Sequence, residues 1–125
     1  MSTNTHSAVS LLARILLAAI FIQSGWGKLG HAADTASYMQ SHGVPGQLVW
    51  LVIATELGGG LAVLLGLFSR TASVLLAGFT ILAAALFHFE PGNQGQMINF
   101  MKNITIAGGL LMLTANGPGK WAVRE

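Results

Sequence analysis

Residues 48–68 read LVWLVIATELGGGLAVLLGLF, and they are the clearest indication of the fold class. It is long enough to cross a bilayer, because a transmembrane helix needs about 20 mainly apolar residues. Glu56 is the single ionisable residue within it. A backbone surrounded by lipid must satisfy its own hydrogen-bonding groups, so we expect this stretch to be an α-helix.

Three other stretches, at about residues 8–29, 71–89 and 97–114, are also apolar and close to the length of a span. A tight break or a turn-forming segment ends each of the last three spans. Only 8% of the residues are charged and 53% are hydrophobic, whereas about 25% charged residues are usual in soluble domains. We therefore predict an all-α membrane protein, in which a single domain over residues 1–125 forms a bundle of four transmembrane helices.

The connection between the first two spans is the only long one, and it predicts a short interfacial helix. Asp34 or Thr35 can cap this helix at its start, and Gly43 would end it. We expect Tyr38 and Met39 to lie at the lipid headgroups.

Four spans place both termini on the same side of the membrane, together with the break between the second and third spans. That side carries Arg70, Lys120 and Arg124. The positive-inside rule then predicts that both termini are cytoplasmic.

Polar side chains of all four spans lie at similar depths, toward the end opposite the termini. Ionisable groups within a span are expensive and usually face other helices or water. We therefore predict a polar pocket around Glu56 that opens toward the outer face of the membrane. Its candidate residues are Gln23, Glu56, His88, Asn99, Lys102 and Asn103.

Glu56, His88 and Lys102 are the candidate catalytic residues, because such groups bond carbonyl oxygens and transfer protons. The alternative for Glu56 and Lys102 is a structural ion pair that fixes helix packing. The alternative for His88 is a solvated residue at the membrane edge.

Gln23, Trp26, Asn99 and Asn103 are the candidate ligand-binding residues. Gln23 and Asn103 have the alternative of hydrogen bonding between helices, which is common for amides in membranes. Trp26 has the alternative of an aromatic belt at the membrane surface. Asn99, Lys102 and Asn103 are three and four residues apart, so we expect them to share one face of the last helix.

Arg14 is the exception, because it lies in the inner half of the first span. One interpretation is that its side chain extends to the inner headgroups. The other is an ion pair with a residue of another helix.

The second span also carries small residues at every fourth position, a pattern that lets another helix approach closely. They lie on roughly the opposite face from Glu56, so we expect this helix to be central. The approaching helix belongs either to the same chain or to another subunit. The small residues are Ala54, Gly58, Ala62 and Gly66.

Composition excludes several kinds of function. The chain has no cysteine, so it has no thiol chemistry and no cysteine-bound iron–sulfur cluster. The histidines have no metal-ligand spacing, and no metal site is predicted. A net charge of +2 without a basic run does not indicate nucleic-acid binding.

Several short motifs together resemble the DoxX family, in its branch of small bacterial inner-membrane proteins. The resemblance extends from about Ala8 to Gly119. The motifs are Ala13-Arg14-Ile15-Leu16, Gly25-Trp26-Gly27-Lys28, Tyr38-Met39, Gly43-Val44-Pro45-Gly46, Glu56-Leu57-Gly58-Gly59-Gly60, Phe87-His88 and Phe100-Met101-Lys102-Asn103.

The resemblance implies a four-helix protein of the bacterial inner membrane. Among the residues that match family motifs are Arg14, Gly25, Lys28 and Gly58, and we expect these four to have structural packing roles. Some relatives are subunits of a thiosulfate:quinone oxidoreductase, and many have no established activity. Since many relatives have no established activity, the resemblance implies the family and its fold more strongly than it implies a function.

Three hypotheses follow. In the first, the chain is a membrane subunit of a quinone-linked oxidoreductase, with a quinone as cofactor and a redox partner protein that supplies electrons. In the second, it is a transporter or binding protein for a small polar or anionic solute, attracted by Lys102 and formed as a homo-oligomer. In the third, it is an assembly subunit without its own activity. Lipid surrounds the chain in each case.

Overall fold

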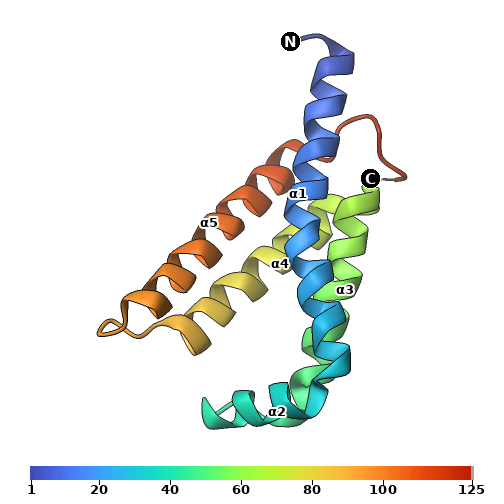
Figure 1. Cartoon of the computed structure of the whole chain (residues 1–125). Coiled ribbons are helices and arrows are strands. Elements are labelled where there is room, and N and C mark those ends of the chain that lie inside the picture. The colour runs from blue at the N-terminus through green and yellow to red at the C-terminus, as the bar shows by residue number, and fades with distance from the viewer. Residues whose placement is uncertain (125) are drawn as a thin grey trace.

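The computed structural model describes residues 1–124, and its elements are helices (Figure 1). In chain order these are α1 (Thr3–Gly30), α2 (Ala32–Ser41), η1 (Gly46–Leu48), α3 (Val49–Leu65), α4 (Ser69–Ala83), η2 (Ala84–His88) and α5 (Gln94–Asn116). The 3₁₀ turn η1 leads into α3, and the π-helical turn η2 continues α4. Over residues 1–124, four helices are long and apolar enough to span a membrane. The predicted fold class is confirmed, including the short helix in the first connection.

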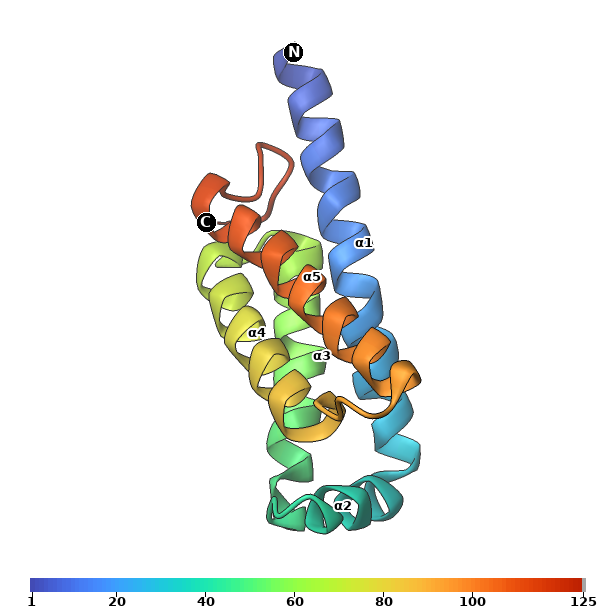
Figure 2. The ribbon, with the colours of Figure 1, turned by 90° about the vertical axis from the view of Figure 1, so that its left-hand side faces the viewer.

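The four spanning helices form two pairs, α1 with α3 and α4 with α5. The pairs lie close together near the chain termini and diverge toward the end that carries α2 (Figure 1). Both termini and the α3–α4 turn lie at one end, while α2 crosses the ends of α1 and α3 at the other (Figure 2). We call these the termini end and the α2 end.

Glycines bring α1 and α3 into close contact. A Cβ atom on Gly25 would lie 2.7 Å from Leu57 Cγ, and one on Gly60 would lie 2.9 Å from Ile22 Cγ1. Side chains at these positions would force the helices apart, so the small residues set the distance between them. Gly25, a predicted packing residue, lies in this interface.

The small residues of the second span, now α3, were expected to let another helix approach closely, and within the chain they do not all do so. Ala54 and Gly58 are exposed, and a Cβ on Gly58 would meet no atom within 4 Å. A Cβ on Gly66 would meet Ala122 of the C-terminal segment and the Arg14 guanidinium of α1. Over residues 1–124, no helix packs on this face at Gly58, so close helix packing uses Gly25 and Gly60 instead.

Helix α2 is anchored by a buried side chain. Met39 is only 4% exposed and packs with Val49 and Ile53 of α3, so its predicted place at the headgroups is wrong. Tyr38, on the same helix, is partly exposed. The predicted cap is also wrong, because the helix begins at Ala32 and Asp34 lies inside its first turn.

Arg14 is buried and holds the segment that follows α5. Its guanidinium donates to the carbonyl oxygens of Pro118 at 3.2 Å and Trp121 at 2.6 Å. The same segment pairs with the α3–α4 turn, where Arg124 N–H donates to Gly66 O at 3.1 Å. At 1% exposure, Arg14 does not extend to the headgroups, and within residues 1–124 it forms no ion pair, so neither interpretation holds over the described chain. The segment lies outside the helices and has free carbonyl oxygens, which bond the two terminal guanidinium nitrogens; Arg14 Nε has no hydrogen-bond partner within residues 1–124.

Candidate functional site

A cavity of about 360 Å³ lies between the helix pairs, toward the α2 end. Helices α1 to α5 and η2 contribute to its wall. Apolar side chains form part of this wall, among them Phe21, Met39 and Phe87. The polar side chains that line it are Ser24, Lys28, Thr35, Tyr38, Glu56, Thr80, His88 and Asn103. We call this space the polar cavity.

An ion pair between Lys28 and Glu56 joins α1 to α3 in the wall of the polar cavity. Lys28 Nζ lies 2.7 Å from Glu56 Oε1 and also donates to Ser24 Oγ at 2.6 Å. Glu56 is 5% exposed. Side chains on a helix tilt toward its N-terminus. Lys28 therefore points back into the membrane from the end of α1, and Glu56 of the antiparallel α3 tilts toward it.

Lys28, and not Lys102, is thus the partner of Glu56. Lys102 is exposed and lies beside Met97, Ile98 and Met101 on another face of α5. Consecutive helical residues are about 100° apart around the axis. Since Asn103 faces the polar cavity, Lys102 must face away from it. The predicted Glu56–Lys102 pair is therefore wrong.

Thr80 places an unsatisfied hydroxyl group in the wall of the polar cavity. Its side chain is 3% exposed, and Thr80 Oγ1 has no hydrogen-bond partner within the described chain. The backbone oxygen of Thr80 accepts a bond of 3.3 Å from Asn103 Nδ2, which links α4 to α5. A buried hydroxyl without a partner costs about 1–3 kcal/mol. A ligand with a polar atom in the cavity can recover this free energy.

His88 reaches the polar cavity from the π-helical turn η2. Its Nδ1 lies 3.0 Å from Gln96 Oε1, and Gln96 also donates to Phe87 O at 3.4 Å. Asn99 Nδ2 donates to the same Gln96 oxygen at 3.2 Å. Turns of this type are frequent at functional sites. Asn99 itself is exposed and does not line the cavity. Its bond to Gln96 helps to position Gln96, which in turn positions His88.

Two predicted ligand-binding residues of α1 lie outside the polar cavity. Gln23 is exposed, and Trp26 is 72% exposed on the outer surface of the helix. Neither lines the cavity, because Ser24 and Lys28 occupy the face of α1 that does. The aromatic-belt interpretation of Trp26 stays a prediction.

Ser24, Thr80 and Gln96 were not predicted as site residues, and Tyr38 was predicted only at the headgroups. The spacing of four residues between Ser24 and Lys28 was a signal, since such residues are neighbours on a helix. Thr80 gave no signal, because threonine in a span usually bonds to its own helix backbone. Thr55 and Thr105 do so in this protein.

The charges and donors of the polar cavity suit a neutral polar group. Lys28 and Glu56 neutralise each other, so the pair adds no net charge, and the hydroxyl and amide groups around it donate and accept hydrogen bonds. No group of three or more potential metal ligands occurs in residues 1–124. The cavity can therefore hold a ligand that carries carbonyl or hydroxyl oxygens.

The DoxX family model matches residues 9–89 of the chain. The chain belongs to the DoxX family. The matched region contains Lys28, Glu56, Thr80 and His88, and it ends before Asn103.

Two relatives from Escherichia coli (strain K12) are similar to this DoxX-family chain. Inner membrane protein YqjF is 48% identical over 113 residues, which cover 90% of this chain and 87% of the relative. Inner membrane protein YphA is 36% identical over 116 residues, which cover 87% of this chain and 83% of the relative. No solved structure matches the chain. Together with its four apolar helices, these relatives identify the chain as a multi-pass inner-membrane protein.

Proposed function

We propose that this DoxX-family protein binds the polar ring of a quinone in the polar cavity, as a redox-associated component of the inner membrane. The observation that carries the proposal is the buried Thr80 hydroxyl, which has no partner in residues 1–124 and lines the cavity. A quinone carbonyl oxygen would accept a hydrogen bond from it. This contact removes the free-energy cost of the unsatisfied group only when the ligand is bound.

The surrounding groups have the chemistry that a quinone ring requires. Lys28 and Asn103 carry N–H donors for a second carbonyl oxygen. Glu56 is the candidate proton acceptor, and His88 lies near the membrane edge as a candidate exit for the proton. Reduction of the ring to the quinol takes two electrons and two protons. A redox partner protein would supply the electrons, and Glu56 and His88 would relay protons.

The charge arrangement favours a neutral ligand over an anionic one. Lys102, which the transport hypothesis requires to attract the solute, faces away from the polar cavity. The charge of Lys28 is compensated by Glu56 at 2.7 Å. An anion would therefore meet no free positive charge from either lysine.

Replacement of Thr80 by valine tests the proposal, because valine keeps the shape of the side chain and removes the hydroxyl. In lipid nanodiscs, Thr80→Val should weaken the binding of tailless ubiquinone ring by about tenfold, the equivalent of one hydrogen bond of about 1.4 kcal/mol. Stability should not fall, since an unsatisfied buried group is removed. Titration followed by quenching of intrinsic tryptophan fluorescence measures the first effect, and thermal unfolding measures the second.

Thr105→Val is the matched control, since Thr105 is exposed on α5 and already bonds to Met101 O. It should leave ring binding unchanged. Absence of saturable binding to the wild-type protein, or equal affinities of the two variants, would reject the proposal in favour of an assembly subunit or a different ligand.

A further inference from the structure

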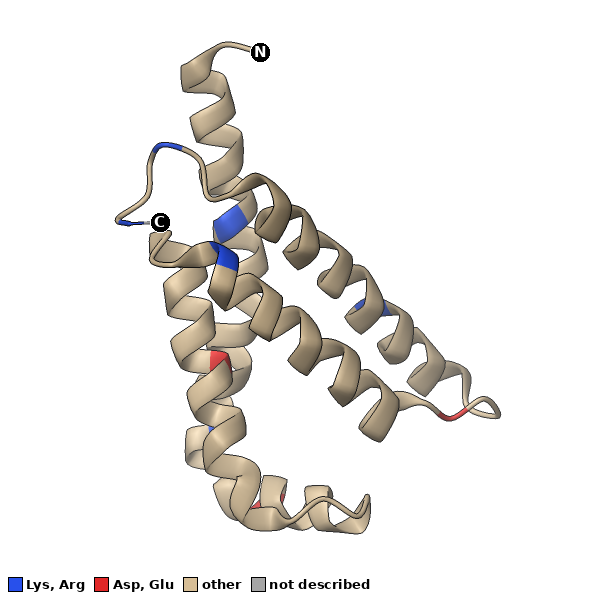
Figure 3. Ribbon diagram, turned by 180° about the vertical axis from the view of Figure 1, so that it is seen from behind, with Lys and Arg blue, Asp and Glu red and all other residues tan. Residues whose placement is uncertain are grey.

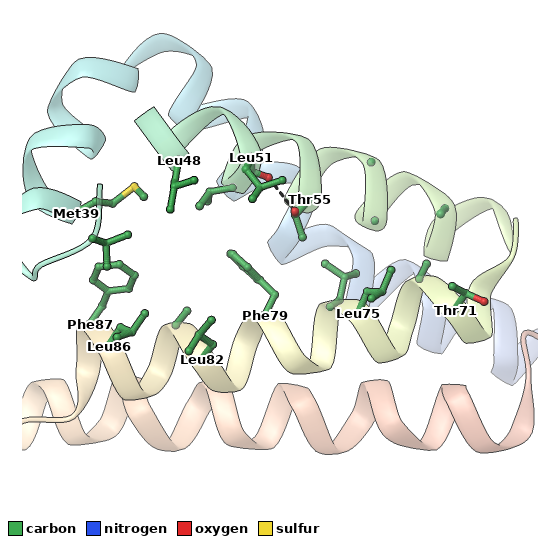
Figure 4. A pocket seen from close by; sticks show the side chains of 18 of the residues that line it. Met39, Leu48, Leu51, Thr55, Thr71, Leu75, Phe79, Leu82, Leu86 and Phe87 are labelled. Atoms are coloured by element: carbon green, nitrogen blue, oxygen red, sulfur yellow. Dashed lines mark hydrogen bonds between the residues drawn. The ribbon is translucent and has the colours of Figure 1, made fainter. Parts of the chain in front are cut away.

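An apolar groove of about 640 Å³ runs between α3 and α4 (Figure 4). Leucine side chains of both helices line it, including Leu48 and Leu51 from η1 and α3, and Leu75 and Leu82 from α4. Thr55 is one of its few polar residues, and its hydroxyl is already bonded to Leu51 O. The groove therefore offers almost no hydrogen-bonding capacity to an occupant.

The groove adjoins the polar cavity. Met39, Val52, Phe79, Ala83 and Phe87 line both spaces. These five side chains, from α2, α3, α4 and η2, therefore form a wall that the groove and the polar cavity share. A ligand of sufficient length can contact both spaces from this border.

Small residues keep the groove open. Gly58 and Ala62 of α3 line it, and a Cβ on Gly58 would meet open space. From Leu48 to Ala62 the helix rises about 21 Å, at 1.5 Å per residue. The groove is thus an elongated space beside the polar cavity, and it is long enough for a single hydrocarbon chain.

We infer that the ligand is a single-chain amphiphile, with its polar ring in the polar cavity and its hydrocarbon tail in the groove between α3 and α4. The inference rests on the proposed function and narrows it to quinones that carry a tail. The tail leaves lipid for the groove, so it gains no hydrophobic free energy and binds through close packing alone. The ligand would enter sideways from the bilayer, between the two helix pairs.

Gly58→Leu tests the inference, because it fills the groove without a clash inside the chain. Gly78→Leu is the matched control: Gly78 is an exposed glycine of the neighbouring α4, its Cβ position is also open, and it lines none of the described cavities. Both changes replace a helical glycine by leucine, so their effects on helix propensity should be similar.

Affinities are measured in nanodiscs for decylubiquinone and for the same ring without a tail. The ligand concentration is expressed per mole of lipid. Gly58→Leu should weaken decylubiquinone by about tenfold and leave the tailless ring unchanged, since only packing of the tail is lost. Gly78→Leu should change neither affinity. An unaltered affinity of Gly58→Leu for decylubiquinone would overturn the inference while the proposed function survives. If the wild-type protein does not bind the tailless ring, both the inference and the proposed function are overturned.

A second measurement locates the tail directly. A decylubiquinone with a diazirine at the end of its tail should label residues 48–62 and 75–86, and excess tailless ring should suppress the labelling by displacing the head. Labelling that the ring does not suppress would show that bulk lipid chains fill the groove, and would overturn the inference. Cross-links between two copies across the groove would overturn it as well.

Discussion

At the level of single residues, Lys28 of α1 and Lys102 of α5 have different contacts. This difference predicts how the loss of each lysine changes the stability of the protein. Lys28→Met would leave the buried Glu56 carboxylate without its partner, at a cost of about 3 kcal/mol. Lys102→Met removes the same charge from an exposed position without a partner in residues 1–124, and should leave stability unchanged or higher. Unfolding of both variants in the same lipid measures the contrast. Equal destabilisation by the two changes would contradict the assigned partner of Glu56.

At the scale of elements, the contact between α1 and α3 depends on the absence of a side chain at Gly25. Gly25→Leu would force these helices apart at Leu57 and should lower stability by about 1–3 kcal/mol, the usual range for an overpacked interface. Gly27→Leu, two residues further along α1, adds the same side chain where a Cβ meets open space. Thermal unfolding should therefore separate the two variants, and similar midpoints would show that this interface is not tight.

At the scale of the whole molecule, the positive charges predict the orientation. Arg14 bonds to the C-terminal segment and Arg70 lies in the first turn of α4, so both lie at the termini end with Lys120 and Arg124. Figure 3 shows several of the blue positions at this end. Because the chain has no cysteine, single-cysteine variants report the sides without background. A membrane-impermeant maleimide added to intact spheroplasts should label Gly92→Cys and leave Asn4→Cys unlabelled until the membrane is opened. The reverse pattern would place the termini outside the cytoplasm.

The sequence predicted the depth of the polar groups better than the faces on which they lie. Depth follows from the rise of a helix, and Glu56, His88 and Asn103 do line one cavity at the α2 end. The rotation of each helix follows from its contacts, such as Gly25 against Leu57, which no span shows alone. For this reason Lys102 and Gln23 were assigned to the pocket, whereas Lys28 was assigned to packing.

The Arg14 contacts were beyond prediction for a related reason. The acceptors of Arg14 are backbone oxygens of Pro118 and Trp121, and backbone oxygens leave no trace in a sequence. The four spans themselves followed from hydropathy alone, while the segment after α5 lies in no span.

The contacts of Arg14 also impose an order of events on biogenesis. Arg14 precedes Trp121 by 107 residues, so the ribosome delivers the cation long before its acceptors. During membrane insertion, α1 must therefore carry a guanidinium that only water, lipid headgroups or the insertion machinery can satisfy. The bundle closes at the termini end only when residues 118–124 have been made and have folded back over the α3–α4 turn. Chains stalled before that point would expose a charged first helix, which quality-control proteases can distinguish from the finished protein.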